Sequence, residues 1–303
     1  LNDQVTNAVE NSHLSGAGCH WNLTEMVLVG KPMILSDISV SLVAGAATNA
    51  IRIVGDGVTI KNLNAVGNLG TVDPSERAAL LEIKGSDFLI DGANFYNSSR
   101  DGIECRANNT AQAVPVRNGI IRNIYGNGNR SDTVKISTGN LGLTKTYNIT
   151  IDNVVAENCP ITPSQGSPHG TAQYGAVEVT DGSQEITVNQ VHAYSCRYGM
   201  VIQDHGNPDQ VNHSIWASNI YVEDSFYAVV TELSDFGHSN VTIANVTATR
   251  VQSPVYMFYL TNVTFSDLNI ANTTTSSPAV TLENVNNFSM DRTRVNGGAP
   301  AST

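Results

Sequence analysis

A six-residue phrase that alternates apolar and polar side chains and then places an amide returns nine times along this chain. Its clearest copies are residues 58–63, 149–154 and 241–246. Looser copies are centred on Ile90, Ile121, Val188, Ala217, Phe265 and Met290. Successive centres lie 22 to 37 residues apart, with no helical pattern between them. A strand repeat of this length predicts a β-solenoid in which each repeat forms one coil.

The fifth position of the phrase carries an amide in most copies. The residues found there are Asn62, Gly92, Asn123, Asn153, Gln190, Asn219, Asn245 and Asp267. In a solenoid each copy lies directly above the previous one, so side chains at one register form a column. Amides in a column can hydrogen-bond to one another along the axis. We therefore expect an asparagine ladder that belongs to the scaffold.

The composition favours a secreted protein built as one large domain. The 303 residues can form a single solenoid, and charged residues make up only 14% of them. The net charge is -11 and no basic patch is visible, which makes nucleic acid a poor partner. No apolar run approaches the length of a membrane span. We expect an extracellular protein, secreted or associated with a surface.

The chain divides into a cap, a solenoid and a tail. Residues 1–38 hold the first strands and an N-terminal segment whose apolar spacing fits a short amphipathic helix. Such a helix would cover the unpaired strand edge at the end of a solenoid. Residues 39–295 carry the repeats, in about nine or ten coils. Residues 296–303 are small and polar, which predicts a flexible tail.

Cys159 and Cys196 lie at equal offsets from the centres of consecutive repeats. Equal offsets place two residues about 4.8 Å apart, one strand spacing, which suits a disulfide. The alternative is a column of small residues, because Ser98 and Ser225 hold the same offset in neighbouring coils. The cysteines and histidines show no spacing typical of a structural metal site.

Asn-x-Ser/Thr sequons are frequent in this chain. The candidate glycosylation sites are Asn97, Asn108, Asn129 and Asn212. The alternative is that threonine follows asparagine at many positions because it is a good strand residue.

A second strand precedes the amide phrase in each coil and supplies most of the charged candidates. Alternation predicts that one side of these strands faces solvent, with side chains of successive coils in rows. The first row contains Arg52, Glu82, Glu104, Lys135 and Glu178. The second row contains Arg106, Ser137, Thr180 and Asp204. The third row contains Ala107, Thr138, Asp181 and His205, and the apolar run at 200–202 allows the last coil to shift by one residue.

These repeats, with Ser-Arg-Asp-Gly-Ile-Glu at 99–104 and Tyr-Gly-Met-Val-Ile at 198–202, resemble the pectate-lyase-like superfamily. The resemblance covers residues 39–295 and concerns the fold, without a single family motif. It implies an all-β, right-handed parallel β-helix. The superfamily includes polysaccharide lyases, glycoside hydrolases, uronate epimerases and viral tailspikes. The resemblance therefore implies a protein that binds or acts on a polysaccharide or other glycan.

The resemblance suggests three mechanisms. A lyase would use Lys135 as the base with Arg106, and Ca²⁺ would serve if the substrate is a polyuronate; no other cofactor is expected. Glu104 and Glu178 on either side would raise the pKa of Lys135, which opposes that role. An inverting hydrolase needs two carboxyl groups about 6.5–9.5 Å apart, and Glu104 and Glu178 are about 9.6 Å apart at the backbone. An epimerase would use His205 with a tyrosine.

The candidate catalytic residues are Glu104, Lys135, Glu178, Asp181, Asp204 and His205. The candidate substrate-binding residues are Arg106, Trp216 and Tyr198. The competing interpretation is that rows of alternating charge only hold neighbouring coils together. The protein would then be a non-catalytic surface, filament-forming or viral spike protein, and a homo-oligomer would suit that role.

Overall fold

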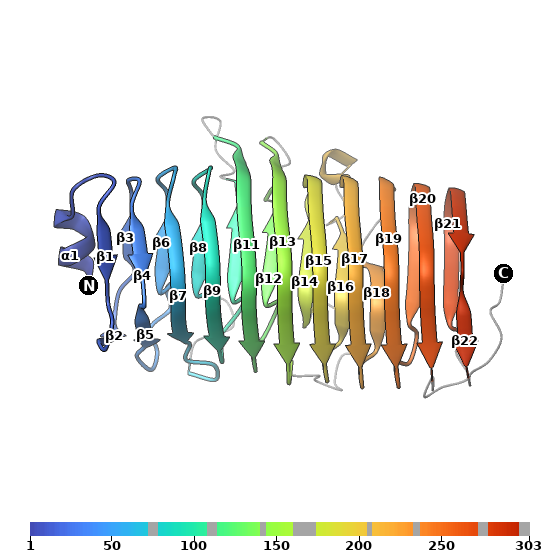
Figure 1. Cartoon of the computed structure of the whole chain (residues 1–303), viewed down its shortest axis with the longest axis horizontal. Coiled ribbons are helices and arrows are strands. Elements are labelled where there is room, and N and C mark those ends of the chain that lie inside the picture. Colours follow the sequence, from blue (N-terminus) through green and yellow to red (C-terminus); the bar gives the residue numbers. More distant parts are fainter. Residues whose placement is uncertain are drawn as a thin grey trace.

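The computed structural model describes residues 1–71, 78–107, 114–139, 144–159, 174–204, 208–232, 237–271 and 278–296. Across these ranges, 22 strands form one continuous sheet with parallel pairing, and a short α-helix, α1 (Asn2–Asn7), precedes them. The strands stack along one axis, with α1 at one end and β21 and β22 at the other (Figure 1). The expected all-β parallel coil is confirmed.

The strands fall into three columns. Column A holds β3 (Val27–Val29), β6 (Ile51–Ile53), β8 (Leu81–Ile83), β10 (Ile103–Arg106), β12 (Val134–Ser137), β14 (Gly175–Thr180), β16 (Tyr198–Gln203), β18 (Tyr227–Glu232) and the first parts of β20 (Val255–Ala271) and β21 (Val280–Asp291). Column B starts with β1 (His13–Ser15) and β4 (Ile34–Ser36), and column C with β2 (His20–Leu23) and β5 (Ser39–Leu42).

Beyond β5, one long strand in each coil runs through columns B and C. These strands are β7 (Thr59–Val66), β9 (Leu89–Tyr96), β11 (Val116–Asn127), β13 (Thr146–Glu157), β15 (Gln184–Tyr194), β17 (His213–Glu223), β19 (His238–Thr249) and the later parts of β20 and β21. The short strand β22 (Arg294–Asn296) pairs with the end of β20. A 3₁₀ turn at Pro208–Gln210 lies between β16 and β17.

The nine repeat centres pair with one another in sequence order. The pairing runs through Ile60, Ile90, Ile121, Ile151, Val188, Ala217, Ile243, Phe265 and Met290. The interval between centres therefore varies because the segments that connect the paired strands differ in length. This register explains why a phrase of only six residues could reveal the fold.

The amide of the phrase sits at the bend between columns B and C. Asn62, Asn123 and Asn153 have φ angles of 52°, 57° and 56°, a left-handed conformation that asparagine tolerates better than most residues. The side-chain amide of Asn153 donates to Asn123 Oδ1 at 2.9 Å. That of Asn245 donates to Asn219 Oδ1 at 2.5 Å. The expected ladder is present, and it also supplies the backbone bend.

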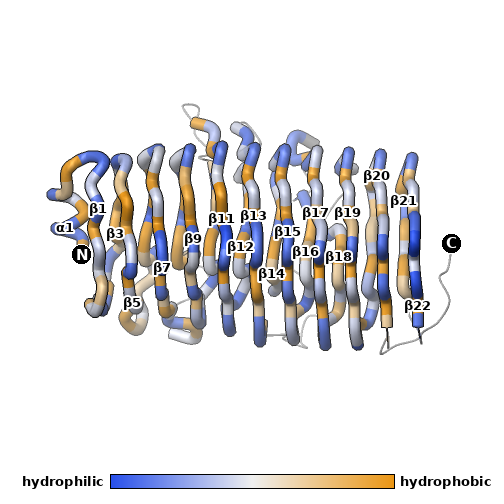
Figure 2. The backbone as a smooth tube through the Cα atoms, viewed as in Figure 1, coloured by the Kyte–Doolittle hydropathy of each residue, from blue (hydrophilic) through white to orange (hydrophobic). Residues whose placement is uncertain are grey.

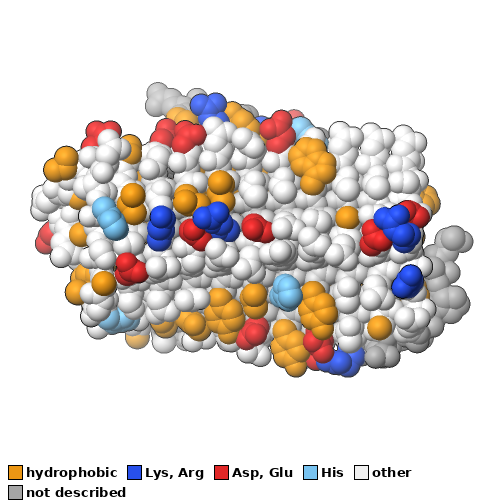
Figure 3. Space-filling model, in the orientation of Figure 1, with side chains coloured by type: hydrophobic (Ala, Val, Ile, Leu, Met, Phe, Trp, Pro, Cys, Tyr) orange, Lys and Arg blue, Asp and Glu red, His pale blue; other side chains and the backbone are white. Residues whose placement is uncertain are grey.

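A second ladder, which the repeat phrase did not predict, lies at the start of column B. There Asn148 donates to Asn118 Oδ1 at 2.8 Å, and Asn262 donates to Asn240 Oδ1 at 3.0 Å. Figure 3 shows the face formed by the long strands, and most of its side chains are uncharged. Amides therefore hold successive coils together on this side with few ion pairs.

Hydrophobic and hydrophilic residues alternate along the strands (Figure 2), and the apolar ones fill a single core along the axis. The helix α1 closes the N-terminal end and buries Val5 in that core. It is shorter than the predicted segment because Ala8 already has extended backbone angles. Cys159 and Cys196, the pair indicated by the spacing, form a disulfide with their Cα atoms 4.6 Å apart. None of the described helices is long and apolar enough to cross a membrane.

Candidate functional site

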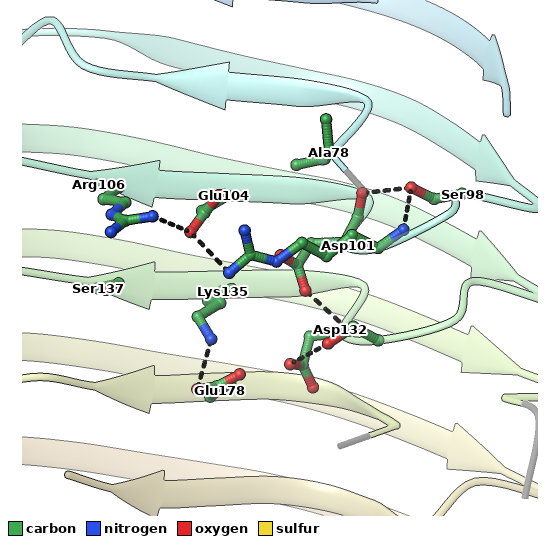
Figure 4. Close-up of polar contacts among 12 residues, drawn as sticks. Ala78, Ser98, Asp101, Glu104, Arg106, Asp132, Lys135, Ser137 and Glu178 are labelled. Atoms are coloured by element: carbon green, nitrogen blue, oxygen red, sulfur yellow. Dashed lines mark hydrogen bonds and ion pairs between the residues drawn. The ribbon is translucent and has the colours of Figure 1, made fainter. Parts of the chain in front are cut away.

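The outward side chains of column A form a cluster of charges, which we call the charged face. Its members are Arg52, Glu82, Lys84, Arg100, Asp101, Glu104, Arg106, Asp132, Lys135, Glu178, Arg197, Gln203 and Glu232. The strand register places the first predicted row, from Arg52 to Glu178, on five neighbouring strands. Figure 4 shows part of this cluster, with Glu104, Lys135 and Glu178 on consecutive strands.

The expectation that this row faces solvent is wrong for four of its five members, and Arg52 alone is partly exposed. Glu104, Lys135 and Glu178 are 3%, 5% and 0% exposed. The alternation of apolar and polar residues in a strand predicts which way a side chain points, but its exposure to solvent depends on which other side chains cover it. Here the side chain of Arg100 lies above, with Nη2 3.5 Å from Glu104 Oε1 and Nε 3.3 Å from Asp101 Oδ2.

Lys135 and Glu178 form the most deeply buried ion pair of the face. Lys135 Nζ lies 2.8 Å from Glu178 Oε1, and the side-chain amide of Gln203 donates to the same oxygen. Burial alone would lower the pKa of Lys135, but the charges of Glu178, Asp101 and Glu104 outweigh burial and raise it. The raised pKa favours the ammonium form of Lys135, which opposes a role as catalytic base.

Asp132 is a member of the face that the rows did not include. The hydroxyl of Tyr198 donates to Asp132 Oδ1 at 2.6 Å, and both side chains are fully buried. Burial, and then the nearby charge of Glu178, raise the pKa of Asp132 well above the ordinary aspartate value. Asp101 and Asp132 precede β10 and β12 by the same two residues. That shared offset was the signal available in the sequence.

The arginines of the charged face lie outside its carboxylates, whereas Lys135 is buried among them. The Arg100 side chain is 35% exposed, whereas Asp101 and Glu104 beneath it are 0% and 4% exposed. Arg106 is 25% exposed above Glu104, and Arg52 is 33% exposed above Glu82 at 8%. Long guanidinium side chains extend past short carboxylates that stay close to the strands. The outermost charges are therefore positive, although the whole chain is acidic.

Asp181 and Asp204 require a correction of register. Thr180 pairs with Gln203, so Gln203 holds the place that we predicted for Asp204, and Asp204 follows in the row of Asp181. Both aspartates are buried, and Ser137 Oγ donates to Asp181 Oδ2 at 2.7 Å. His205 lies outside the described residues, so its predicted role stays a prediction.

Of the three predicted substrate-binding residues, Arg106 alone belongs to the exposed part of the charged face. Tyr198 is fully buried and bonded to Asp132, so direct contact with a substrate is ruled out. Trp216 is 46% exposed on β17, a strand of columns B and C. The sequence grouped these residues because alternation and residue type do not distinguish the outer faces of different columns.

Two of the predicted glycosylation sites are incompatible with this fold. Asn129 is 2% exposed and its Oδ1 accepts from the Ser98 backbone. Asn212 is fully buried and its Oδ1 accepts from the backbone of Gly182 and Ser183. A sequon whose amide is buried in this way has no room for a glycan. Asn97 is exposed and stays a prediction, and Asn108 lies outside the described residues.

Within the described ranges, no group of three or more histidine, cysteine, aspartate or glutamate side chains is arranged to hold a metal ion. The carboxylates of the charged face instead lie against arginine and lysine. These residues do not form a calcium site by themselves.

No protein-family model matches the sequence, and no curated protein matches it either. The fold, however, is similar to several solved structures. One is a 1,3-α-1,4-β-D-galactose-4-sulfate-3,6-anhydro-D-galactose-2-sulfate 4 galactohydrolase, with a TM-score of 0.59 and 10% identity over 100% of this chain and 84% of that one. This chain has the right-handed parallel β-helix fold of the pectate-lyase-like proteins.

Two further structures have the same fold over the whole of this chain. A polygalacturonase from Erwinia carotovora ssp. carotovora has a TM-score of 0.56 and 11% identity, with 92% of its own length covered. The A-module of a mannuronan C-5 epimerase from Azotobacter vinelandii has a TM-score of 0.52 and 10% identity, with 91% covered. These structural similarities establish the architecture of the β-helix, and sequence identities this low leave its activity open.

Proposed function

We propose that this β-helix is an extracellular protein that binds an acidic polysaccharide along the charged face of column A. The observation that carries the proposal is the order of charges, with arginine outside and carboxylate beneath. A ligand that approaches this face meets Arg52, Arg100 and Arg106 first. Uronate and sulfate groups have the oxygen geometry that a guanidinium fork recognises.

The dimensions of the face suit a polymer. From Arg52 on β6 to Glu232 on β18 there are six strand spacings, about 29 Å in all. The names of the similar structures refer to a sulfated galactose polymer, polygalacturonate and mannuronan, which agrees with an acidic glycan as ligand. The disulfide between Cys159 and Cys196 supports an oxidising, extracellular location.

Binding to polysaccharides of different charge tests this proposal. In affinity electrophoresis, polygalacturonate or a sulfated galactan should retard the protein and uncharged dextran should not. Arg106→Ala removes an exposed guanidinium and leaves Glu104 beside Arg100, so it should weaken binding about tenfold. Arg122→Ala is the matched control, because Arg122 is an exposed, ion-paired arginine on β11. Equal retardation by dextran, or equal losses in the two variants, would contradict the proposal.

Hydrolysis of the bound polymer is the second candidate function. Burial, the largest effect, raises the pKa of Glu104, and a raised pKa is what a general acid needs. Glu178 lies two strands away, about 9.6 Å at the backbone, and is fully buried against Lys135, so hydrolysis would require the polymer to displace the side chains that cover both carboxyl groups. New reducing ends that Glu104→Gln abolishes, with binding retained, would support hydrolysis. Unsaturated products would instead indicate a lyase, and binding without turnover would leave a non-catalytic protein.

A further inference from the structure

A second apolar cluster lies outside the core, on the same face of column A. The row that contains Lys135 and Glu178 continues through Val201, Val230 and Tyr256. The row therefore changes from charged to apolar between β14 and β16. Together with Tyr198 and Tyr227 these residues form a small cluster separate from the main core.

The two outer members of this cluster are aromatic rings with partly exposed surfaces. The rings of Tyr227 and Tyr256 are stacked, with centroids 6.2 Å apart and an interplanar angle of 21°. Beneath them Tyr198, Val201 and Val230 are fully buried. We call Tyr227 and Tyr256 the tyrosine platform. Stacking on a packed apolar floor fixes both rings and keeps their exposed surfaces apolar.

Two of the charges beside the platform pair with each other, and a third is the exposed carboxylate of Glu283, which accepts from the Tyr256 hydroxyl at 3.4 Å. Arg197 lies over the ring of Tyr227, 6.0 Å from its centroid, and its Nη2 is 2.6 Å from Glu232 Oε1. The Arg197 side chain is only 14% exposed, much less than Arg100 or Arg106. A uronate or sulfate above the platform would therefore lose its hydration and gain only contact with aromatic rings and with Arg197, whose charge is already paired with Glu232. That exchange is unfavourable for an anion.

An uncharged pyranose suits the platform. One side of a pyranose ring presents C–H groups, which pack against an aromatic ring, and its hydroxyls can reach polar groups at the rim. Glu283, exposed beside the Tyr256 hydroxyl, is such a group here, whereas Glu232 is buried. Tyr256 lies three strand spacings, roughly 14 Å, beyond Glu178 along the same row, and Tyr227 is on β18, one strand nearer to Glu178.

We propose that Tyr227 and Tyr256 form a stacking subsite for an uncharged sugar of the same polysaccharide that the charged face binds. This inference rests on the proposed function and narrows the ligand to an acidic polysaccharide that also contains uncharged sugars. The arginine end would hold the anionic units, and the tyrosine end would hold a neutral one.

Three polymers distinguish this arrangement from binding by charge alone. They are polygalacturonate, which is uniformly acidic, dextran, which is uncharged, and hyaluronan, which alternates an acidic and an uncharged sugar. At about 1 M NaCl, where charges are screened beyond about 3 Å, hyaluronan should bind more tightly than either of the others. Tyr227→Ala and Tyr256→Ala should each lower that affinity about three- to tenfold.

Matched variants separate stacking from an effect on folding. Tyr227→Phe and Tyr256→Phe keep the rings and should retain affinity. Tyr221→Ala removes an exposed tyrosine from β17 and should change nothing. With wild-type protein and a hyaluronan oligosaccharide, saturation transferred from aromatic protons should be strongest on the uncharged sugar. Strongest transfer to the acidic sugar, or alanine variants that bind hyaluronan normally, would overturn the subsite.

The outcomes also separate this inference from the proposed function. If Arg106→Ala weakens binding and Tyr256→Ala does not, the charged face stands and the stacking subsite is rejected. If none of the acidic polymers binds, the proposed function fails and the subsite fails with it.

Discussion

Lys135 Nζ lies 2.8 Å from Glu178 Oε1, with both side chains buried, at the centre of the charged face. Two charges removed from water in this way depend on each other, because neither has solvent to replace the partner. The charge of Glu178 therefore raises the pKa of Lys135 against the effect of its burial. The buried pair also means that Lys135 serves the structure of the face and leaves contact with a ligand to the outer arginines.

Removing the lysine should destabilise the fold. Lys135→Met leaves the Glu178 carboxylate buried without its ammonium partner, which should lower the free energy of unfolding by about 3–5 kcal/mol. Urea unfolding followed by circular dichroism measures this loss. Lys61→Met, at an exposed lysine of β7, is the control and should change stability by less than about 0.5 kcal/mol. The double variant with Glu178→Gln should recover part of the loss, and no recovery would argue against a direct pair.

Stability should fall in mild acid because of His238. This histidine is fully buried, its Nδ1 accepts from the backbone N–H of Asn212 at 3.1 Å, and burial lowers its pKa to about 3. The unfolded chain takes up the proton near pH 6.5, so it binds more protons than the folded chain between pH 6.5 and 3. The stabilisation is complete above pH 6.5 and is lost towards pH 3, on the order of 5 kcal/mol.

A His238→Gln variant isolates this contribution. Urea midpoints measured from pH 7 to 4 should fall less steeply for the variant than for the wild type. Glu104 and Asp132 titrate in both proteins, so their effects cancel in the comparison. Parallel curves would show that His238 does not titrate as its burial requires.

The asparagine ladder should show a specific order of substitutions. Asn153→Ala loses the hydrogen bond to Asn123. It also places alanine, which tolerates a left-handed backbone less well than asparagine, at a φ of 56°, so the variant should lose about 2–3 kcal/mol of stability. Asn153→Gly loses the same hydrogen bond but adopts that φ easily, so it should cost about 1 kcal/mol less. Thermal or urea unfolding ranks the two variants. If the Asn153→Ala variant is as stable as the Asn153→Gly variant, the backbone bend does not depend on the residue at this position.

The disulfide should be a major source of stability. Cys159 and Cys196 close a loop with a separation of 37 residues, and in the chain-entropy view this contributes about 4 kcal/mol. A double Cys159→Ser and Cys196→Ser variant should unfold at correspondingly lower urea, and dithiothreitol should shift only the wild type. If dithiothreitol leaves the wild-type midpoint unchanged, the two thiols are not joined in the protein.

The scaffold could be predicted from the sequence because equivalent positions of successive repeats pair with each other in a solenoid, so the repeat gives the strand register. All nine repeat centres pair as expected, and so does the row from Arg52 to Glu178. Burial could not be predicted, because it depends on contacts from outside the row, such as that of Arg100, which precedes β10 and lies against Asp101 and Glu104. The register error at Asp204 has a local cause, since three consecutive apolar residues at 200–202 hide the alternation.

Other parts of the site needed the three-dimensional arrangement. The tyrosine platform joins Tyr227 and Tyr256 from different coils, and each alone looks like an ordinary strand residue. Asn212 shows an error of the opposite kind, because a residue predicted to be an exposed glycosylation site holds buried backbone groups together. Short-range sequence patterns specify the direction of each side chain and the register of each strand. The burial of a side chain and its partners in neighbouring coils follow from three-dimensional packing.

A crystal structure of the protein with an oligogalacturonate would locate the bound polymer. We expect an oligosaccharide that lies along column A, with carboxylate groups within hydrogen-bonding distance of the guanidinium groups of Arg100 and Arg106. An oligosaccharide bound instead to the amide-rich face of the long strands, at a concentration that gives full occupancy, would contradict this expectation.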